Sequence, residues 1–133
     1  MARWLLKTEP STYSFDDLVR ERVTAWTGVS NPQAQAHLKA MAPGDELVVY
    51  HSGVKEAVGL ATVVKAAYPD PTVDGGTVCV DVKAGARLAA PVGLDALKGS
   101  RPFEGSPLLR QGRLSVVPLT AAQWDALLAL GRG

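Results

Sequence analysis

Glycine and proline residues interrupt the apolar stretches of this chain at short intervals, and this spacing restricts the folds that it can adopt. The 133 residues include 13 glycines and 9 prolines, spread between the apolar runs. Both residue types end regular structure, since proline lacks an amide hydrogen and glycine favours turns. The pattern predicts many short elements in a β-rich or α+β fold, and the length predicts one domain over residues 1–133.

Apolar periodicity and capping residues place the expected elements along the chain. We expect strands over Arg3–Lys7, Val23–Trp26, Leu47–His51, Val58–Val64, Thr77–Val82 and Arg113–Val117. We expect helices after Ser14 to about Arg20, from Asn31 to before Pro43, for one or two turns within Pro91–Gly99, and over Thr120–Leu130. Residues 100–112 are expected to form a loop with Leu108 and Leu109 docked on the core. Because the strands cluster without regular helical crossovers, a doubly wound parallel sheet is disfavoured.

The chain lacks the residue patterns of common metal and cofactor sites. His37 and His51 are the only histidines, and Cys79 is the only cysteine. No zinc-ligand spacing, phosphate loop or dinucleotide fingerprint is present, so we expect no metal and no cofactor. We expect His37 on the surface and Cys79 in a buried strand. The lack of a signal peptide and of a long apolar run predicts a cytoplasmic protein without membrane contact.

Acidic and basic residues nearly balance. The formal net charge is +1, from 14 basic and 13 acidic residues. A protein that grips a long nucleic-acid backbone is usually more basic. The balance leaves room for a protein that binds a single nucleotide, because such a site needs few phosphate contacts.

Four clusters combine aromatic and polar residues. They are Trp4–Pro10, Trp26–Asn31, Tyr50–Gly53 and Arg110–Ser115. Together they supply indoles, a phenol, amides, hydroxyls and cations, which are the groups needed to hold one flat polar heterocycle. Aromatic faces stack on a base for about 1–3 kcal/mol, while polar groups bind its edge.

Each cluster also has an ordinary structural interpretation. Lys7 and Glu9 share one face of a strand, with Thr8 on the other, and could form a salt bridge at the strand end. Trp26 could be a core residue, and the polar residues after Tyr50 could be solvated. The arginines of the fourth cluster could pair with surface carboxylates.

Several motifs at matched spacing resemble the EVE domain family. They are Trp4-Leu5-Leu6-Lys7-Thr8-Glu9-Pro10, Trp26-x-Gly28-Val29-x-Asn31-x-Gln33-Ala34 and Gly44-Asp45-x-x-x-x-Tyr50-His51-Ser52. The match continues through Val58-Gly59-Leu60-Ala61-x-Val63-Val64, Tyr68-Pro69-Asp70 and Arg113-Leu114-Ser115-Val116-x-Pro118. The resemblance covers nearly the whole chain in the right order.

The resemblance implies an α+β, PUA-like fold, a small mixed or antiparallel β-barrel with short flanking helices. It also implies a monomeric, non-enzymatic module that binds nucleic acid and accepts one modified base, either a modified cytosine in DNA or a modified base in RNA. The base-binding residues that it implies here are Trp4, Lys7, Thr8, Glu9, Trp26, Gly28, Val29, Asn31, Tyr50, His51 and Ser52. Arg110 and Arg113 are expected near the phosphate at the mouth.

Within that set, the resemblance implies distinct roles. Trp26 stacks on the base, while Asn31, His51 and Ser52 bind its edge. The chain departs from the family at Thr8, which replaces a serine, and at Thr27, Ser30 and Pro32, which replace an acid, an arginine and a tyrosine. The loss of the arginine and the tyrosine weakens phosphate binding and removes one stacking face.

Two other functions are compatible with the sequence. Lys7, Thr8 and Glu9 are the residue types of an ASCH-barrel amidohydrolase that acts on acetylated cytidine, and such catalysis requires burial to lower the pKa of the lysine. A PUA-like domain that binds structured RNA by shape is the second alternative, and it requires a basic face and steep salt dependence. The near-neutral charge argues against the latter, and a purely structural interaction module is the remaining option.

Overall fold

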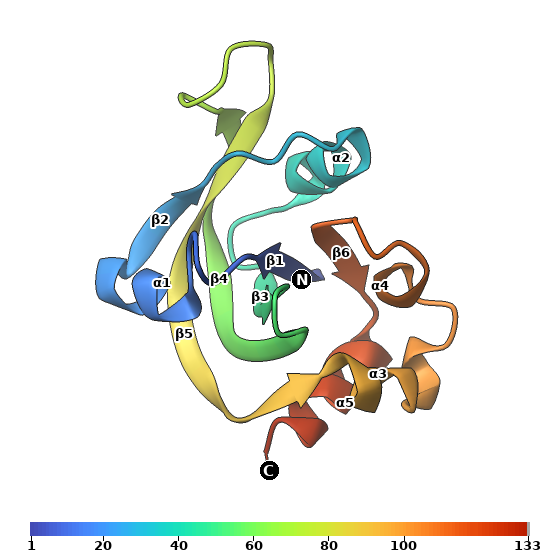
Figure 1. Cartoon of the computed structure of the whole chain (residues 1–133). Coiled ribbons are helices and arrows are strands. Elements are labelled where there is room, and N and C mark those ends of the chain that lie inside the picture. The colour runs from blue at the N-terminus through green and yellow to red at the C-terminus, as the bar shows by residue number, and fades with distance from the viewer. Residues whose placement is uncertain (133) are drawn as a thin grey trace.

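The computed structural model describes residues 1–132 and arranges them as one bent sheet with short helices beside it (Figure 1). The strands are β1 (Arg3–Thr8), β2 (Val23–Trp26), β3 (Glu46–His51), β4 (Glu56–Pro69), β5 (Val78–Gly93) and β6 (Val116–Leu119). The helices are α1 (Phe15–Glu21), α2 (Pro32–Ala40), α3 (Leu94–Lys98), α4 (Pro107–Arg110) and α5 (Ala121–Leu130), with a 3-10 turn η1 (Arg101–Phe103). The predicted α+β class is confirmed.

The strands lie in the order β2-β5-β4-β3-β1-β6. Among the described residues, β1 and β3 form the parallel pair, and the other neighbours are antiparallel. No ladder within residues 1–132 joins the edge strands β2 and β6, so the sheet is open and the expected closed barrel is corrected. The register of β4 against β5 shifts at several points, and such bulges bend the sheet strongly without closing it.

The hairpin of β4 and β5 is longer than the sequence indicated. The helical turns expected within Pro91–Gly99 are present as α3, at Leu94–Lys98. β5 precedes them and continues past Val82 as far as Gly93, through Pro91. Between the pairs Gly59–Arg87 and Ala57–Val92 the register shifts, and proline is tolerated at such irregularities. Much of this segment is exposed, so the alternating apolar pattern of a half-buried strand is missing from it.

The segment before the last helix also differs from the prediction. Residues 101–110 form η1 and α4 instead of an open loop, with Leu108 buried and Leu109 partly buried against the core. The last strand begins at Val116 and not at Arg113, because the amide of Leu114 donates to the carbonyl of Gln111 and closes a turn. The other helices agree with their predicted starts, with capping by Ser14, Asn31 and Thr120.

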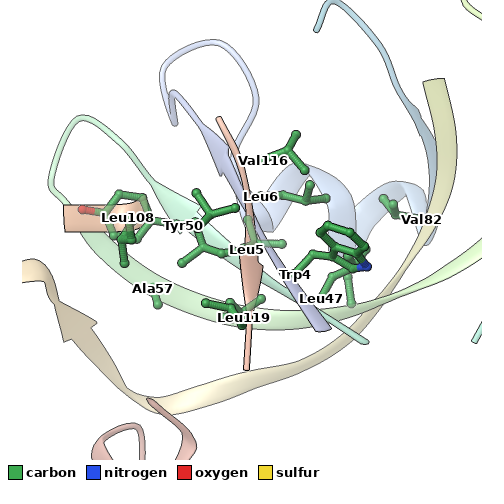
Figure 2. Packing of buried hydrophobic residues seen from close by; sticks show 14 of the residues in the cluster. Trp4, Leu5, Leu6, Leu47, Tyr50, Ala57, Val82, Leu108, Val116 and Leu119 are labelled. Atoms are coloured by element: carbon green, nitrogen blue, oxygen red, sulfur yellow. The ribbon is translucent and has the colours of Figure 1, made fainter. Parts of the chain in front are cut away.

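The core lies on both faces of the central strands. Leu5 and Leu6 of β1 are fully buried on opposite faces, as are Val48 and Val49 of β3, and apolar side chains of β6 pack beside them (Figure 2). A strand that is covered on both faces has a continuous apolar run, which explains the unbroken apolar segments of β1 and β3. In Figure 1, α3, α4 and α5 gather on one side of this core, while α1 lies on the other beside β2 and β5.

Cys79 was expected in a buried strand and His37 on the surface, and the structure confirms only the first expectation. Cys79 is buried in β5, as predicted. His37 is not a free surface residue, because its ring lies 5.6 Å from that of Trp4 and its Nε2 atom is buried without a hydrogen-bond partner among residues 1–132. Burial lowers the pKa of this imidazole. None of the described helices combines the length and apolar character needed to cross a bilayer.

Gly59 in β4 fixes the position of α1. Phe15, the first residue of that helix, is fully buried, and a Cβ atom at Gly59 would overlap its ring. The missing side chain therefore lets α1 pack directly on the strand. This contact positions α1, whose last residue, Glu21, lines the cavity described below.

Replacing Gly59 by alanine is expected to lower the free energy of unfolding by about 1–3 kcal/mol, since Phe15 must leave its packed position. Urea unfolding measures this change. Gly93→Ala is the matched control, because a Cβ there meets no atom within 4 Å and the backbone φ is −74°. The control should leave stability unchanged or slightly raised. An equal loss in both variants would contradict the packing argument.

Candidate functional site

A cavity of about 650 Å³ lies where the end of β1, α1, β2 and the loop before α2 meet. From the predicted set it is lined by Lys7, Thr8, Glu9, Trp26, Gly28, Val29, Asn31 and Arg113. The tertiary structure adds residues outside the predicted site, among them Tyr13, Glu21, Thr24, Ser30 and Ser115. The wall thus combines two aromatic rings with hydroxyl, amide, carboxylate and cationic groups.

Trp26 and Tyr13 form the aromatic part of the wall. Their ring centroids are 5.9 Å apart and the planes are inclined by 87°, an edge-to-face arrangement. Trp26 is 8% exposed, so most of its indole belongs to the core and a small part of its surface lines the cavity. The structural and functional interpretations of this tryptophan are therefore compatible.

The hydroxyl of Tyr13 points to the end of α1. It donates to Oε1 of Glu21 at 2.5 Å, and both residues line the cavity. Burial and this contact with Glu21 raise the pKa of Tyr13 to about 12, so the phenol stays protonated and remains a donor at neutral pH. Little in the sequence pointed to this pair, because Tyr13 directly precedes the helix cap Ser14 and Glu21 reads as an ordinary final helix residue.

The loop from Trp26 to Asn31 is held by buried side chains from other elements. Gly28 has a φ of +78°, a conformation that favours glycine, and its amide donates to Oδ2 of Asp70 at 2.9 Å. Nε2 of Gln35 donates to the carbonyl of Val29 at 2.7 Å. The other oxygen of Asp70 accepts from the amide and hydroxyl of Thr72. The loop is thereby tied to α2 and to the turn of the β4–β5 hairpin.

Asn31 serves two elements at once. Its Oδ1 atom accepts from the amide of Ala34 at 3.0 Å and caps α2, as its position before Pro32 predicted. Its Nδ2 group makes no hydrogen bond to any of residues 1–132, and Asn31 is one of the residues that line the cavity. The amide is therefore fixed by its oxygen, while its nitrogen is available as a donor.

Lys7 connects β1 to the loop before β6. Its Nζ atom donates to the carbonyl of Gly112 at 3.0 Å and lies 5.7 Å from the ring centroid of Tyr50. Burial lowers the pKa of this lysine. No ion pair joins Lys7 to Glu9 within the described chain, so the alternative interpretation of a salt bridge at the strand end is wrong. Glu9 instead accepts weakly from the amide and hydroxyl of Ser11, both at 3.3 Å.

Thr8 faces the same cavity as Lys7 and Glu9, which differs from the alternation expected of a strand. β1 ends at Thr8, and the amides of residues 12 and 13 return to the carbonyl of Glu9 in a tight turn. The alternation of faces does not continue through such a turn. The hydroxyl of Thr8 donates to the carbonyl of Tyr13 at 2.7 Å and fixes that turn.

Five predicted site residues do not line the cavity: Trp4, Tyr50, His51, Ser52 and Arg110. Trp4 and Tyr50 lie on opposite sides of Leu5 within the core (Figure 2). The indole of Trp4 donates to Oδ2 of Asp45 at 3.2 Å. Tyr50 is 3% exposed, and burial raises the pKa of its phenol.

His51 and Ser52 do not line the cavity, but they bind the backbone of the start of α1 and of the end of β1. Nε2 of His51 accepts from the amide of Phe15 at 3.0 Å, so the neutral imidazole caps the first amide of α1. Burial is the largest influence that lowers the pKa of His51 and keeps it neutral. The amide of Ser52 donates to the carbonyl of Thr8 at 2.9 Å. The guanidinium of Arg110 lies near Gly105, outside the cavity lining.

The donor set does not resemble a metal centre. Among residues 1–132, no three His, Cys, Asp or Glu side chains gather closely enough to hold a metal ion. The carboxylates at the cavity, Glu9 and Glu21, accept hydrogen bonds from Ser11 and Tyr13. The arrangement is suited to binding a planar polar group through stacking and several directed hydrogen bonds.

Comparison with known proteins places this arrangement in a family. The family model of the EVE domain matches residues 2–130. Thymocyte nuclear protein 1 of Rattus norvegicus is 33% identical over 96% of this chain and 72% of its own length. The NMR structure of a protein from Rhodopseudomonas palustris is 44% identical, with a TM-score of 0.92, and the match covers 98% of this chain and 93% of that one. The crystal structure of human THYN1 in complex with 5-methylcytosine-containing DNA is 31% identical, with a TM-score of 0.88 and coverage of 100% and 99%.

The Asp70 contacts generate a prediction about stability and pH. Hydrogen bonds from Thr72 and from the amide of Gly28 lower the pKa of Asp70, so its ionised form stabilises the fold. Asp70→Asn is therefore expected to reduce stability at pH 7 and to lower the melting temperature. The stability that wild-type protein gains from the carboxylate is present above the unfolded-state pKa of about 3.9 and is lost as the pH falls through the folded-state value.

Urea unfolding from pH 7 to pH 3 tests this, with the gap between wild type and Asp70→Asn closing at the acid end. Asp74→Asn is the control, since Asp74 is exposed in the same hairpin turn and accepts no hydrogen bond within the described chain. A gap that is independent of pH would show that the carboxylate charge plays no part.

Proposed function

Because the chain belongs to the EVE domain family, we propose that it binds nucleic acid that carries a modified base and accepts this base in the cavity beside Trp26. The observation that carries the proposal is the cavity wall, in which an aromatic pair stands next to hydrogen-bonding groups on a fixed backbone. Its volume of about 650 Å³ falls within the usual range of small-ligand pockets, about 300–1,000 Å³. A single base with part of its sugar fits such a space.

A modified cytosine in DNA is the target that we favour. The support is the human THYN1 structure, which is a complex with 5-methylcytosine-containing DNA. Stacking on an aromatic face recovers part of the few kcal/mol needed to flip a base from a duplex. The unpaired Nδ2 of Asn31 and the hydroxyl groups of the wall supply contacts to the base edge.

Arg113 is the residue that we propose for phosphate contact. It is exposed, lines the cavity and forms no salt bridge within residues 1–132. The loop that carries Arg113 is fixed to β1 through Lys7. The Nζ atom of Lys7 donates to the carbonyl of Gly112, and the backbone amide of Lys7 donates to the carbonyl of Ser115. A cation held at the mouth in this way meets the phosphate that flanks an inserted base.

Binding fits the site better than catalysis. An amidohydrolase built on Lys7 and Glu9 needs the lysine free to exchange a proton with substrate or carboxylate. Here Nζ of Lys7 is held by the carbonyl of Gly112 and pairs with neither cavity carboxylate within residues 1–132. Lys7 therefore acts as a structural tether of the cavity wall.

Trp26→Ala is expected to weaken binding to a strand with 5-methylcytosine by about tenfold or more, because the stacking face is lost. Fluorescence anisotropy with labelled oligonucleotides measures this, with unmodified cytosine as the reference. Trp26→Phe keeps an aromatic ring and should retain most of the affinity.

The control is Trp124→Ala, which removes a tryptophan of similar burial, 5% exposed, from α5 and away from the cavity. If Trp124→Ala weakens binding as much as Trp26→Ala does, the loss of affinity follows from reduced stability and not from the loss of the stacking face. Equal affinity of wild type for modified and unmodified strands would refute the proposed function.

Arg113→Ala is expected to weaken binding to modified and unmodified strands alike and to lower the slope of log K against log salt by about 1. Arg110→Ala makes the same change in net charge three residues earlier in the chain, outside the cavity lining, and should leave the slope unchanged. A slope that falls equally in both variants would point to a diffuse charge effect instead of one phosphate contact.

A further inference from the structure

Glu21 is a carboxylate that lines the cavity and forms no salt bridge within residues 1–132. It is the last residue of α1, and it is exposed. Its Oε1 atom accepts from the hydroxyl of Tyr13, whose ring packs edge-to-face with Trp26. This chain of contacts fixes the carboxylate at one side of the space next to the indole.

The Glu21 carboxylate has one oxygen that can accept a hydrogen bond from a ligand. An ionised carboxylate only accepts hydrogen bonds, and the Tyr13 hydroxyl already occupies Oε1, which leaves Oε2 for a ligand donor. The other carboxylate, Glu9, accepts weakly from Ser11 through Oε1 and lies against Gly53, where an added Cβ would be 2.9 Å from Oε2 of Glu9. Glu21 is the carboxylate that is joined through Tyr13 to the Trp26 ring, and so the one positioned next to a base that stacks there.

We propose that Glu21 selects bases with an exocyclic amino group, such as cytosine and its 5-methyl form, and rejects bases that have a carbonyl at that position. The proposal rests on the function proposed above and names the group within the cavity that decides which base is retained. The amino group of cytosine donates to Oε2, as carboxylates accept from this amine in other protein–nucleic acid contacts. In thymine the corresponding atom is a carbonyl oxygen, an acceptor that faces another acceptor.

Thymine and 5-methylcytosine form an informative pair for this question. Both carry the ring methyl group, so contacts to the methyl are the same, and the pair differs at the amino or carbonyl position and the adjoining ring nitrogen. Tyr13 reinforces the distinction, because its hydroxyl stays protonated at neutral pH and keeps the carboxylate in place. Discrimination between these bases therefore reports on Glu21 and not on the pocket for the methyl group.

The experiment is a comparison of single-stranded oligonucleotides that differ only in 5-methylcytosine or thymine at one position. Single strands are chosen because thymine opposite guanine in a duplex is a mismatch, which lowers the energy of flipping. Wild type is expected to bind the 5-methylcytosine strand about 10- to 100-fold more tightly, the range for one charged hydrogen bond gained or left unmade.

Glu21→Gln is expected to bring the two affinities to within about threefold of each other, because a rotated amide can donate to the thymine carbonyl or accept from the amino group. Tyr13→Phe should reduce the discrimination partly, since the carboxylate loses its positioning donor. Glu104→Gln is the matched control, an exposed glutamate outside the cavity lining, and should retain the wild-type ratio.

The outcomes separate this inference from the proposed function. If Glu21→Gln keeps the wild-type ratio while Trp26→Ala still loses affinity, Glu21 selectivity is overturned and modified-base binding stands. If wild type binds all strands equally and Trp26→Ala changes nothing, both proposals fail. A ratio that collapses in Glu21→Gln with its affinity for 5-methylcytosine largely retained supports the assignment.

Discussion

The cavity depends on how the buried backbone between Trp26 and Asn31 satisfies its polar groups. The amide of Gly28 and the carbonyl of Val29 belong to no sheet ladder. The amide of Gly28 donates to the side chain of Asp70, and the carbonyl of Val29 accepts from the side chain of Gln35. Gln35 also donates to the carbonyl of Val78 and accepts from its amide, so one buried amide joins the loop to the start of β5. A buried polar group without a partner costs about 1–3 kcal/mol, so these hydrogen bonds favour the observed conformation of the loop.

A similar carboxylate fixes the opposite end of β1. Asp45 accepts from the amides of Ala2 and Ala42 and from the indole of Trp4. Burial opposes ionisation of this carboxyl group, but the three hydrogen bonds outweigh it and lower the pKa. The polar residues of the sequence motifs therefore divide between two tasks. Asp45 and His51 hold β1 and α1 in place, whereas Asn31 and Arg113 face the cavity.

The charges at the cavity are balanced, as are those of the whole chain. Two cations, Lys7 and Arg113, lie with two carboxylates, Glu9 and Glu21, in the same wall. Such a site attracts a polyanion weakly and distinguishes ligands by directed hydrogen bonds at short range. This agrees with a net charge of +1 and with local contact to one nucleotide instead of an extended backbone.

The sequence by itself determined most elements and the family. Capping at Ser14, Asn31 and Thr120 and the apolar runs of β1 and β3 depend on neighbours within a few residues, so their pattern is visible along the chain. The tertiary structure alone decided the length of the β4–β5 hairpin, the open sheet edges and which motif residues meet. Trp4 and Trp26 both stand in motifs that combine an aromatic residue with polar residues. The structure separates them, because the indole of Trp4 donates to Asp45 in the core and Trp26 lines the cavity. Glu21 lines the cavity at the end of α1, a helix whose first residue, Phe15, packs against Gly59 of a distant strand. Contacts of this kind join residues far apart in the sequence, and local propensity carries no information about them.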